Sequence, residues 1–186
     1  MKRLFAAIKA TPNPEFIDSY RTLKHDLRKH SIKWVEEENL HITLKFFGET
    51  SEAVIPDICR VMDSVTVDLP DFSFRYEGLG IFGSNYNPRV IWAGIHPYEE
   101  VFQIIQQLKT KLTTIGFSAD RQNPVPHLTL GRIRSLQDHT IFQAVLDSYK
   151  NIASAPMMAK KLVLFESILL RSGPEYHIIK SFLLKK

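Results

Sequence analysis

Two stretches of the 186-residue chain, Asn39-Leu40-His41-Ile42-Thr43-Leu44 and Pro126-His127-Leu128-Thr129-Leu130, repeat one pattern. Each is a His-x-Thr-Leu unit inside an apolar run of the kind that forms a β-strand. One such tetrapeptide would indicate little. Two of them, separated by nearly half of the chain, predict two similar halves that each contribute one histidine to a symmetric site.

The same order of elements surrounds both motifs. A long amphipathic helix is predicted before each histidine, at about residues 15–30 and 98–115, and a shorter helix follows each, at about 51–64 and 137–149. The remaining apolar runs predict strands at residues 3–8, 32–35, 40–47, 72–76, 90–95, 127–133, 161–170 and 176–183. The Gly-rich stretch 78–83 is expected to connect two of these strands, and Ser51 is expected to cap the second helix.

This order predicts an α+β fold in which two mostly antiparallel sheets face a central cleft and helices cover the outside. No linker or low-complexity segment separates the two halves. We therefore expect one domain, residues 1–186, made of two pseudo-symmetric lobes.

Composition restricts the function only loosely. The chain is 44% apolar and 24% charged, with a net charge of +4 and a pI near 9.1, which is typical of a globular protein and favours a polyanionic partner without requiring one. No apolar stretch approaches the ~20 residues of a membrane span, and the apolar part of Met1–Lys9 is too short for a signal peptide. We expect a cytoplasmic monomer with no membrane partner. Cys59 is the only cysteine, which excludes an intrachain disulfide, and we expect its thiol to be buried.

Alternation along a strand determines which side chains meet. Successive side chains point to opposite faces, so His41, Thr43, Lys45 and Phe47 are predicted to share one face. His127 and Thr129 share a face in the second motif. If the two strands meet across a pseudo-twofold axis, both His/Thr pairs line one cleft.

These residue types suit acid–base chemistry on a phosphate ester. Histidine titrates near pH ~6.5, so one imidazole can be neutral while the other is protonated. The neutral ring can take a proton from an attacking water, and the imidazolium can protonate the departing oxygen. The threonine hydroxyls can hold the non-bridging phosphoryl oxygens. No second His or Cys stands at ligand spacing near either motif, which favours a reaction without metal or other cofactor.

At these residues the chain resembles the 2H phosphoesterases, which carry two His-x-Thr/Ser motifs. It is most similar to the RNA 2′,3′-cyclic phosphodiesterases of bacteria and archaea, also called 2′-5′ RNA ligases. The similar stretches are Arg3–Phe5, Asn39–Gly48, Gly78–Gly80, Pro88–Gly94 and Pro126–Arg132. The resemblance implies a bilobal fold and hydrolysis of RNA 2′,3′-cyclic phosphate ends, or of small cyclic nucleotides, to 2′-phosphomonoesters.

The resemblance also implies roles for individual residues. His41 is expected to be the general acid and His127 the general base. Thr43, Thr129 and Arg132 are expected to contact the phosphate. Strict alternation puts Arg132 on the wrong face for this role, so a strand end, a bulge or the reach of its side chain must correct its position.

Several alternatives remain open. Lys45 is either a phosphate or RNA-backbone contact or a solvated strand residue, and Phe5 and Phe47 are either base-stacking platforms or core residues. The protein as a whole could be a non-catalytic RNA or nucleotide-binding module. It could also ligate tRNA halves by the reverse reaction. A matched pair of histidines favours catalysis over binding alone, and abundant water favours hydrolysis over ligation.

Overall fold

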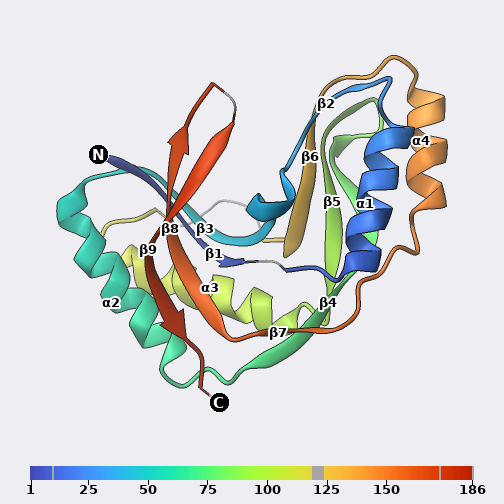
Figure 1. Cartoon of the computed structure of the whole chain (residues 1–186). Coiled ribbons are helices and arrows are strands. Elements are labelled where there is room, and N and C mark those ends of the chain that lie inside the picture. Colours follow the sequence, from blue (N-terminus) through green and yellow to red (C-terminus); the bar gives the residue numbers. More distant parts are fainter. Residues whose placement is uncertain (10, 119–123, 172, 186) are drawn as a thin grey trace.

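The computed structural model of the chain describes residues 1–9, 11–118, 124–171 and 173–185 (Figure 1). Its α-helices are α1 (Pro14–Asp26), α2 (Ile55–Thr66), α3 (Glu99–Thr113) and α4 (His139–Ser148). Its strands are β1 (Lys2–Lys9), β2 (Ser31–Trp34), β3 (His41–Thr50), β4 (Phe72–Ser84), β5 (Asn87–His96), β6 (His127–Ser135), β7 (Met157–Ala159), β8 (Lys161–Leu169) and β9 (Pro174–Leu183). Two short 3-10 helices, η1 (Glu37–Asn39) and η2 (Glu52–Val54), precede β3 and α2.

The described strands form one hydrogen-bonded path in the order β7-β4-β5-β6-β3-β1-β8-β9, with β2 beside β6. The central strands β3 and β6 pair antiparallel at Ile42 and Leu128, the one residue pair recorded between them in the described chain. This narrow junction separates a first half-sheet (β3, β1, β8, β9) from a second half-sheet (β7, β4, β5, β6, β2). The predicted α+β fold is confirmed, and its two antiparallel sheets join edge to edge. We propose that the two half-sheets are the two lobes of one domain.

The chain crosses between the half-sheets before each long helix (Figure 1). α1 follows β1 of the first half-sheet but packs on the second, where the Tyr20 hydroxyl lies 2.7 Å from the Val35 carbonyl oxygen and 2.9 Å from that of Leu130. α3 follows β5 of the second half-sheet but packs beside α2, and its Lys111 ammonium donates to the Ser64 carbonyl oxygen at 2.9 Å. Each half-sheet is therefore covered by helices from both halves of the sequence.

The main core fills the space between the sheet and the helices. Phe16, Tyr20 and Tyr76 are its largest fully buried side chains, and burying an aromatic or aliphatic side chain of this size stabilises the fold by roughly 1.5–3 kcal/mol. A second, smaller cluster of Phe5, Ala7, Val163 and Phe165, with Tyr176 against it, lies on the other face of the first half-sheet. We call this face, turned away from the helices in both half-sheets, the inner face.

The prediction of a connecting loop at residues 78–83 is wrong, because β4 continues through this stretch and pairs with β5 up to the turn. Two glycines make this possible. Gly78 has a φ of +72° at the point where the register shifts between Glu77 and Leu79. At Gly80 a Cβ would collide with the indole of Trp92, so the missing side chain lets that ring lie across the strand.

Smaller differences concern element ends. Ser51 precedes η2 rather than α2 and makes no capping hydrogen bond through its side chain, and α2 begins at Ile55 with a proline in its first turn. The short strand β7 was not predicted, because three residues are too few for a period to show. Cys59 is only half-buried, and burial raises the pKa of its thiol. None of the described helices is long and apolar enough to cross a membrane.

Candidate active site

The two motif histidines occupy matching places, because His41 is the first residue of β3 and His127 the first of β6. The pair Ile42–Leu128 lies between the motifs. In an antiparallel pair, this register puts His41 beside Thr129 and Thr43 beside His127. The four predicted residues therefore surround the junction of the half-sheets on the inner face.

Each imidazole is anchored in the same way. His41 Nδ1 lies 2.7 Å from the carbonyl oxygen of Asn39, and His127 Nδ1 lies 2.6 Å from that of Val125, two residues before the histidine in each case. A carbonyl oxygen can only accept, so Nδ1 carries the hydrogen in both rings. Nε2 of each ring is therefore the atom that can exchange a proton with a substrate.

Aromatic rings hold each imidazole from the sides. The ring centroid of His41 lies 4.8 Å from that of Phe5 and 5.3 Å from that of Tyr176, with the Tyr176 ring perpendicular. The His127 ring lies 4.7 Å from Phe82 in an edge-on arrangement. These contacts restrict ring rotation and partly exclude water, so each half-sheet supplies its own rigid support.

The surroundings disfavour a positive charge on either histidine. Burial is the largest cause that lowers the pKa of His41, and the charges of His127 and Arg132 lower it further, against the opposing effect of the Asn39 carbonyl. Burial and the Arg132 charge likewise lower the pKa of His127. The Arg132 charge thus acts on both rings.

A bulge on β6 accounts for the position of Arg132. Consecutive residues of β5 pair with Thr129 and Gly131, so Leu130 is the extra residue. Leu130 and Gly131 are both buried, and the alternation restarts one residue later. This places Arg132 on the same face as His127 and Thr129. A bulge was one of the three explanations that the sequence analysis offered for such a position.

The equivalent bulge on β3 contradicts the predicted positions of Lys45 and Phe47. Thr43 and Lys45 pair with consecutive residues of β1, so Leu44 is the extra residue. Lys45 therefore turns to the helix face, 7% exposed, and Phe47 packs against Phe117 at 5.2 Å as part of the main core. The prediction that these two side chains share a face with His41 is wrong, because a bulge shifts the alternation by one residue.

Phe46 takes the place on the inner face that was predicted for Phe47. Its ring is 48% exposed, lies 6.5 Å from Phe5 in a stacked arrangement, and carries the Arg3 guanidinium 4.8 Å above it. Phe46 and Arg132 occupy equivalent places after the two bulges. The two halves of the site are thus alike at the histidines and threonines but differ here, where one offers an aromatic ring and the other a cation.

Sequence reasoning also missed Tyr176, Phe82 and Trp92 as neighbours of the histidines. Tyr176 belongs to β9, far from either motif in the sequence, and the Arg132 charge acts on its hydroxyl. Trp92 lies within the similar stretch Pro88–Gly94, and its ring stacks on Phe82 at 5.2 Å. Of these three residues, only Trp92 lies in a stretch that the resemblance had already indicated.

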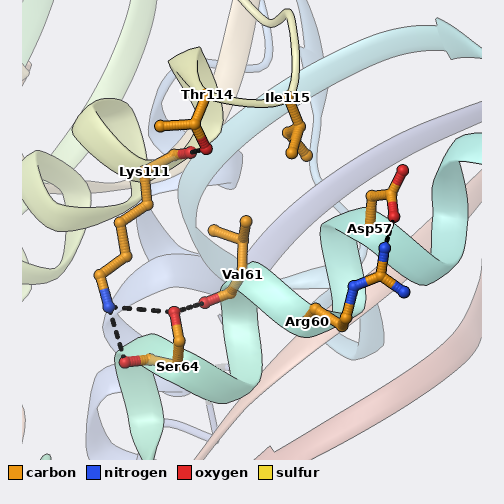
Figure 2. Close-up of a pocket in the computed structure, with 7 residues that line it drawn as sticks. All are labelled: Asp57, Arg60, Val61, Ser64, Lys111, Thr114 and Ile115. Atoms are coloured by element: carbon orange, nitrogen blue, oxygen red, sulfur yellow. Dashed lines mark hydrogen bonds and ion pairs between the residues drawn. The ribbon is translucent and has the colours of Figure 1, made fainter.

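A cavity of about 250 Å³ lies between α2 and α3, on the helix side of the sheet (Figure 2). Figure 2 shows that its charged groups are already bound within it. Lys111 donates to the carbonyl and hydroxyl oxygens of Ser64, and Arg60 bonds to Asp57. With these partners satisfied and both histidines on the other face, this cavity is not the reaction site.

A smaller hollow of about 70 Å³ lies directly beside His41, lined among others by Lys9, Asn39, Phe165 and Tyr176. It lies on the inner face of the first half-sheet, at the start of β3. Among the described residues, no three His, Cys, Asp or Glu side chains form a group that could hold a metal ion.

Comparison with known proteins places this geometry in a family. The chain is 30% identical over 180 residues to an RNA 2′,3′-cyclic phosphodiesterase of Methanocaldococcus jannaschii, covering 97% of this chain and 99% of the relative. It is 34% identical to an RNA 2′,3′-cyclic phosphodiesterase of Aeropyrum pernix over 78% of this chain and 82% of the relative. The crystal structure of E. coli LigT complexed with 3′-AMP superimposes with a TM-score of 0.76 at 19% identity, covering 100% of this chain and 99% of the other.

The family profile described as LigT like Phosphoesterase matches the chain twice, at residues 10–92 and 95–176. One histidine motif lies in each matched stretch, at nearly the same distance from its start. The double match agrees with the repeated order of elements and with the paired strands β3 and β6. The chain belongs to the LigT-like phosphoesterase family of 2H phosphoesterases.

Proposed function

We propose that the protein hydrolyses 2′,3′-cyclic phosphate ends of RNA to 2′-phosphomonoesters by metal-independent catalysis with two histidines. The observation that carries this proposal is the identical anchoring of His41 and His127, each presenting Nε2 beside the junction of the half-sheets. Relatives named RNA 2′,3′-cyclic phosphodiesterases support the substrate class. We expect the protein to act as a cytoplasmic monomer on RNA ends or small cyclic nucleotides.

The proposed reaction proceeds in one displacement at phosphorus. His127 Nε2 takes a proton from water as the water oxygen bonds to phosphorus, and the bond from phosphorus to the 3′-oxygen breaks. His41, protonated at Nε2, gives its proton to the departing 3′-oxygen. The hydroxyls of Thr43 and Thr129 and the guanidinium of Arg132 hold the non-bridging oxygens, whose charge must be stabilised during the displacement.

A binding module that does not turn over its ligand is the alternative from another functional class. Binding alone does not need two imidazoles with the same nitrogen fixed to a carbonyl. A phosphate could equally be held by lysine or arginine. The paired anchoring therefore favours catalysis.

The direct test is incubation with an oligoribonucleotide that ends in a 2′,3′-cyclic phosphate, with and without EDTA. We expect equal rates in both and a product with a 2′-phosphate and a free 3′-hydroxyl, mapped by enzymes specific for each end. Loss of activity with EDTA that a divalent metal restores would refute the metal-free mechanism. A 3′-phosphate product would overturn only the choice of leaving oxygen.

The pH dependence follows from the lowered pKa values of both histidines. Burial and the Arg132 charge lower them in the free enzyme, whereas a bound anionic phosphate favours the imidazolium forms and raises them. The profile of kcat/KM reports the free enzyme and that of kcat the complex. We therefore expect both limbs of the bell-shaped kcat profile at higher pH than those of kcat/KM.

Arg132→Ala provides the control for this expectation. Removing the positive charge raises both histidine pKa values, so the kcat/KM profile should move to higher pH while it keeps both limbs. Substrate binding should also weaken and lose part of its salt dependence. A profile that loses one limb would show that Arg132 itself takes part in proton transfer.

A further inference from the structure

The hollow beside His41 is lined by several side chains that have no role in the proposed reaction. Lys9 pairs with His41 in the ladder of β1 and β3, is exposed, and has no ion pair or hydrogen bond recorded through its side chain among the described residues. Phe165, Tyr176 and Ile178 also line the hollow and give it an apolar wall, and Ile178 is 55% exposed. The hollow thus combines one available cation with an apolar wall.

The geometry of the proposed displacement determines which part of the substrate lies near this hollow. In an in-line displacement the attacking water and the leaving oxygen lie on opposite sides of phosphorus. His127 is the proposed base on the water side and His41 the proposed acid on the 3′-oxygen side. The ribose of the last nucleotide, and the chain that precedes it, therefore leave the reaction centre on the side of His41.

We propose that the hollow is a subsite for the nucleotide that precedes the cyclic end. The phosphodiester between the last two nucleotides contacts the Lys9 ammonium, and the preceding nucleoside lies on the wall of Phe165, Tyr176 and Ile178. Such a combination of a cation with aromatic and apolar side chains is typical of single-stranded nucleic acid sites.

Two features of the surroundings support this occupant. Residues paired in an antiparallel ladder have Cα atoms about 4.5–5.5 Å apart, so the ammonium of Lys9, opposite His41, is within reach of a phosphate next to the one on which His41 acts. Glu38 also borders the hollow. Its negative charge repels any phosphate in the hollow, so the single cation Lys9 can hold one phosphodiester there at most.

The subsite rests on the proposed function, and a ratio of two substrates tests it separately. The substrates are a nucleoside 2′,3′-cyclic phosphate and a dinucleotide with the same cyclic end and a 5′-hydroxyl, which differ by one phosphodiester and one nucleoside. We expect the wild-type protein to prefer the dinucleotide in kcat/KM by roughly tenfold or more, as a charge-assisted contact implies. Because the ratio is taken within one variant, a general change in the site cancels.

Lys9→Met keeps the apolar stem and removes the charge, so the preference should fall several-fold toward the part that the apolar wall supplies, and the salt dependence of kcat/KM for the dinucleotide should decrease. Ile178→Ser, at an exposed position of β9, should reduce the preference with less effect on salt dependence. Lys29→Met is the matched control, because Lys29 is an exposed lysine in the turn after α1, outside the hollow. It should keep the wild-type ratio.

The outcomes separate the two proposals. Hydrolysis of both substrates with the same ratio in wild type, Lys9→Met and Ile178→Ser would overturn the subsite and leave the proposed function standing. A fall in the ratio for Lys29→Met as large as for Lys9→Met would also overturn it, since total charge would then be the cause. Hydrolysis of neither substrate by the wild-type protein would overturn the proposed function and the subsite with it.

Discussion

His41→Ala and His127→Ala are each expected to lower kcat at least ~10²-fold, because each removes one of the two positioned proton transfers. Each Nε2 is oriented by the carbonyl that fixes its ring, and neither Thr43 nor Thr129 can replace it, since a hydroxyl does not titrate near neutral pH. In the proposed mechanism the two proton transfers occur in one displacement. The double variant should therefore lose much less than the product of the two single losses.

Single-turnover rates on a cyclic-phosphate oligoribonucleotide, measured for both single variants and the double variant, check this expectation. Circular dichroism of each variant should match that of the wild-type protein, which would show that the variant is folded. His30→Asn is a useful control, because His30 lies outside the site and accepts a hydrogen bond from the backbone N–H of Gln137 through Nδ1 at 3.2 Å. A folded His41→Ala or His127→Ala protein with near wild-type kcat would show that the assignment of acid and base is wrong.

Thr43→Val and Thr129→Val are expected to produce the next largest losses. Valine keeps the branched shape on the strand and removes only the hydroxyl, so the expected loss is that of the proposed hydrogen bond to a phosphoryl oxygen that gains charge. Removing such a contact costs about 1–3 kcal/mol of transition-state stabilisation, or roughly five- to 150-fold in rate.

Rates across the pH range distinguish holding from proton transfer. Both threonine variants should keep the two limbs of the bell, because the histidines that determine it remain. Thr→Ser at the same positions retains the hydroxyl and should recover most of the rate. A valine variant with full activity, or a serine variant as impaired as the valine variant, would refute the role of the hydroxyl.

Much of the fold was predictable because its signals are periodic. The stripes of α1 and α3 and the apolar runs of β3 and β6 are long enough to show their period, and His41, Thr43, His127 and Thr129 stand before either bulge. Alternation therefore holds for all four. It also exposed the conflict at Arg132, for which a bulge was one of the predicted solutions.

The positions after the bulges could not be obtained in this way. An extra residue at Leu44 leaves no mark in the sequence, because a leucine suits either face of a strand, and it exchanges the faces of Phe46 and Phe47. Tyr176 contacts His41 because the hairpin of β8 and β9 brings its ring there. The side-chain amide of Asn39 helps to hold this hairpin, since its Nδ2 donates to the Pro174 carbonyl oxygen at 3.3 Å. Such long-range placement depends on the whole sheet rather than on a local pattern.

The crossing of the chain before α1 and α3 has a consequence for how the protein acquires its activity. Neither sequence repeat contains a complete half-sheet together with the helices that cover it. The long helix of each repeat, α1 or α3, covers the half-sheet that holds the other repeat's histidine motif (Figure 1). A nascent chain that has only its first repeat therefore leaves apolar helix and strand surfaces without a partner. The proposed reaction therefore requires both repeats, because a fragment with a single motif lacks the long helix that covers its half-sheet and the second histidine.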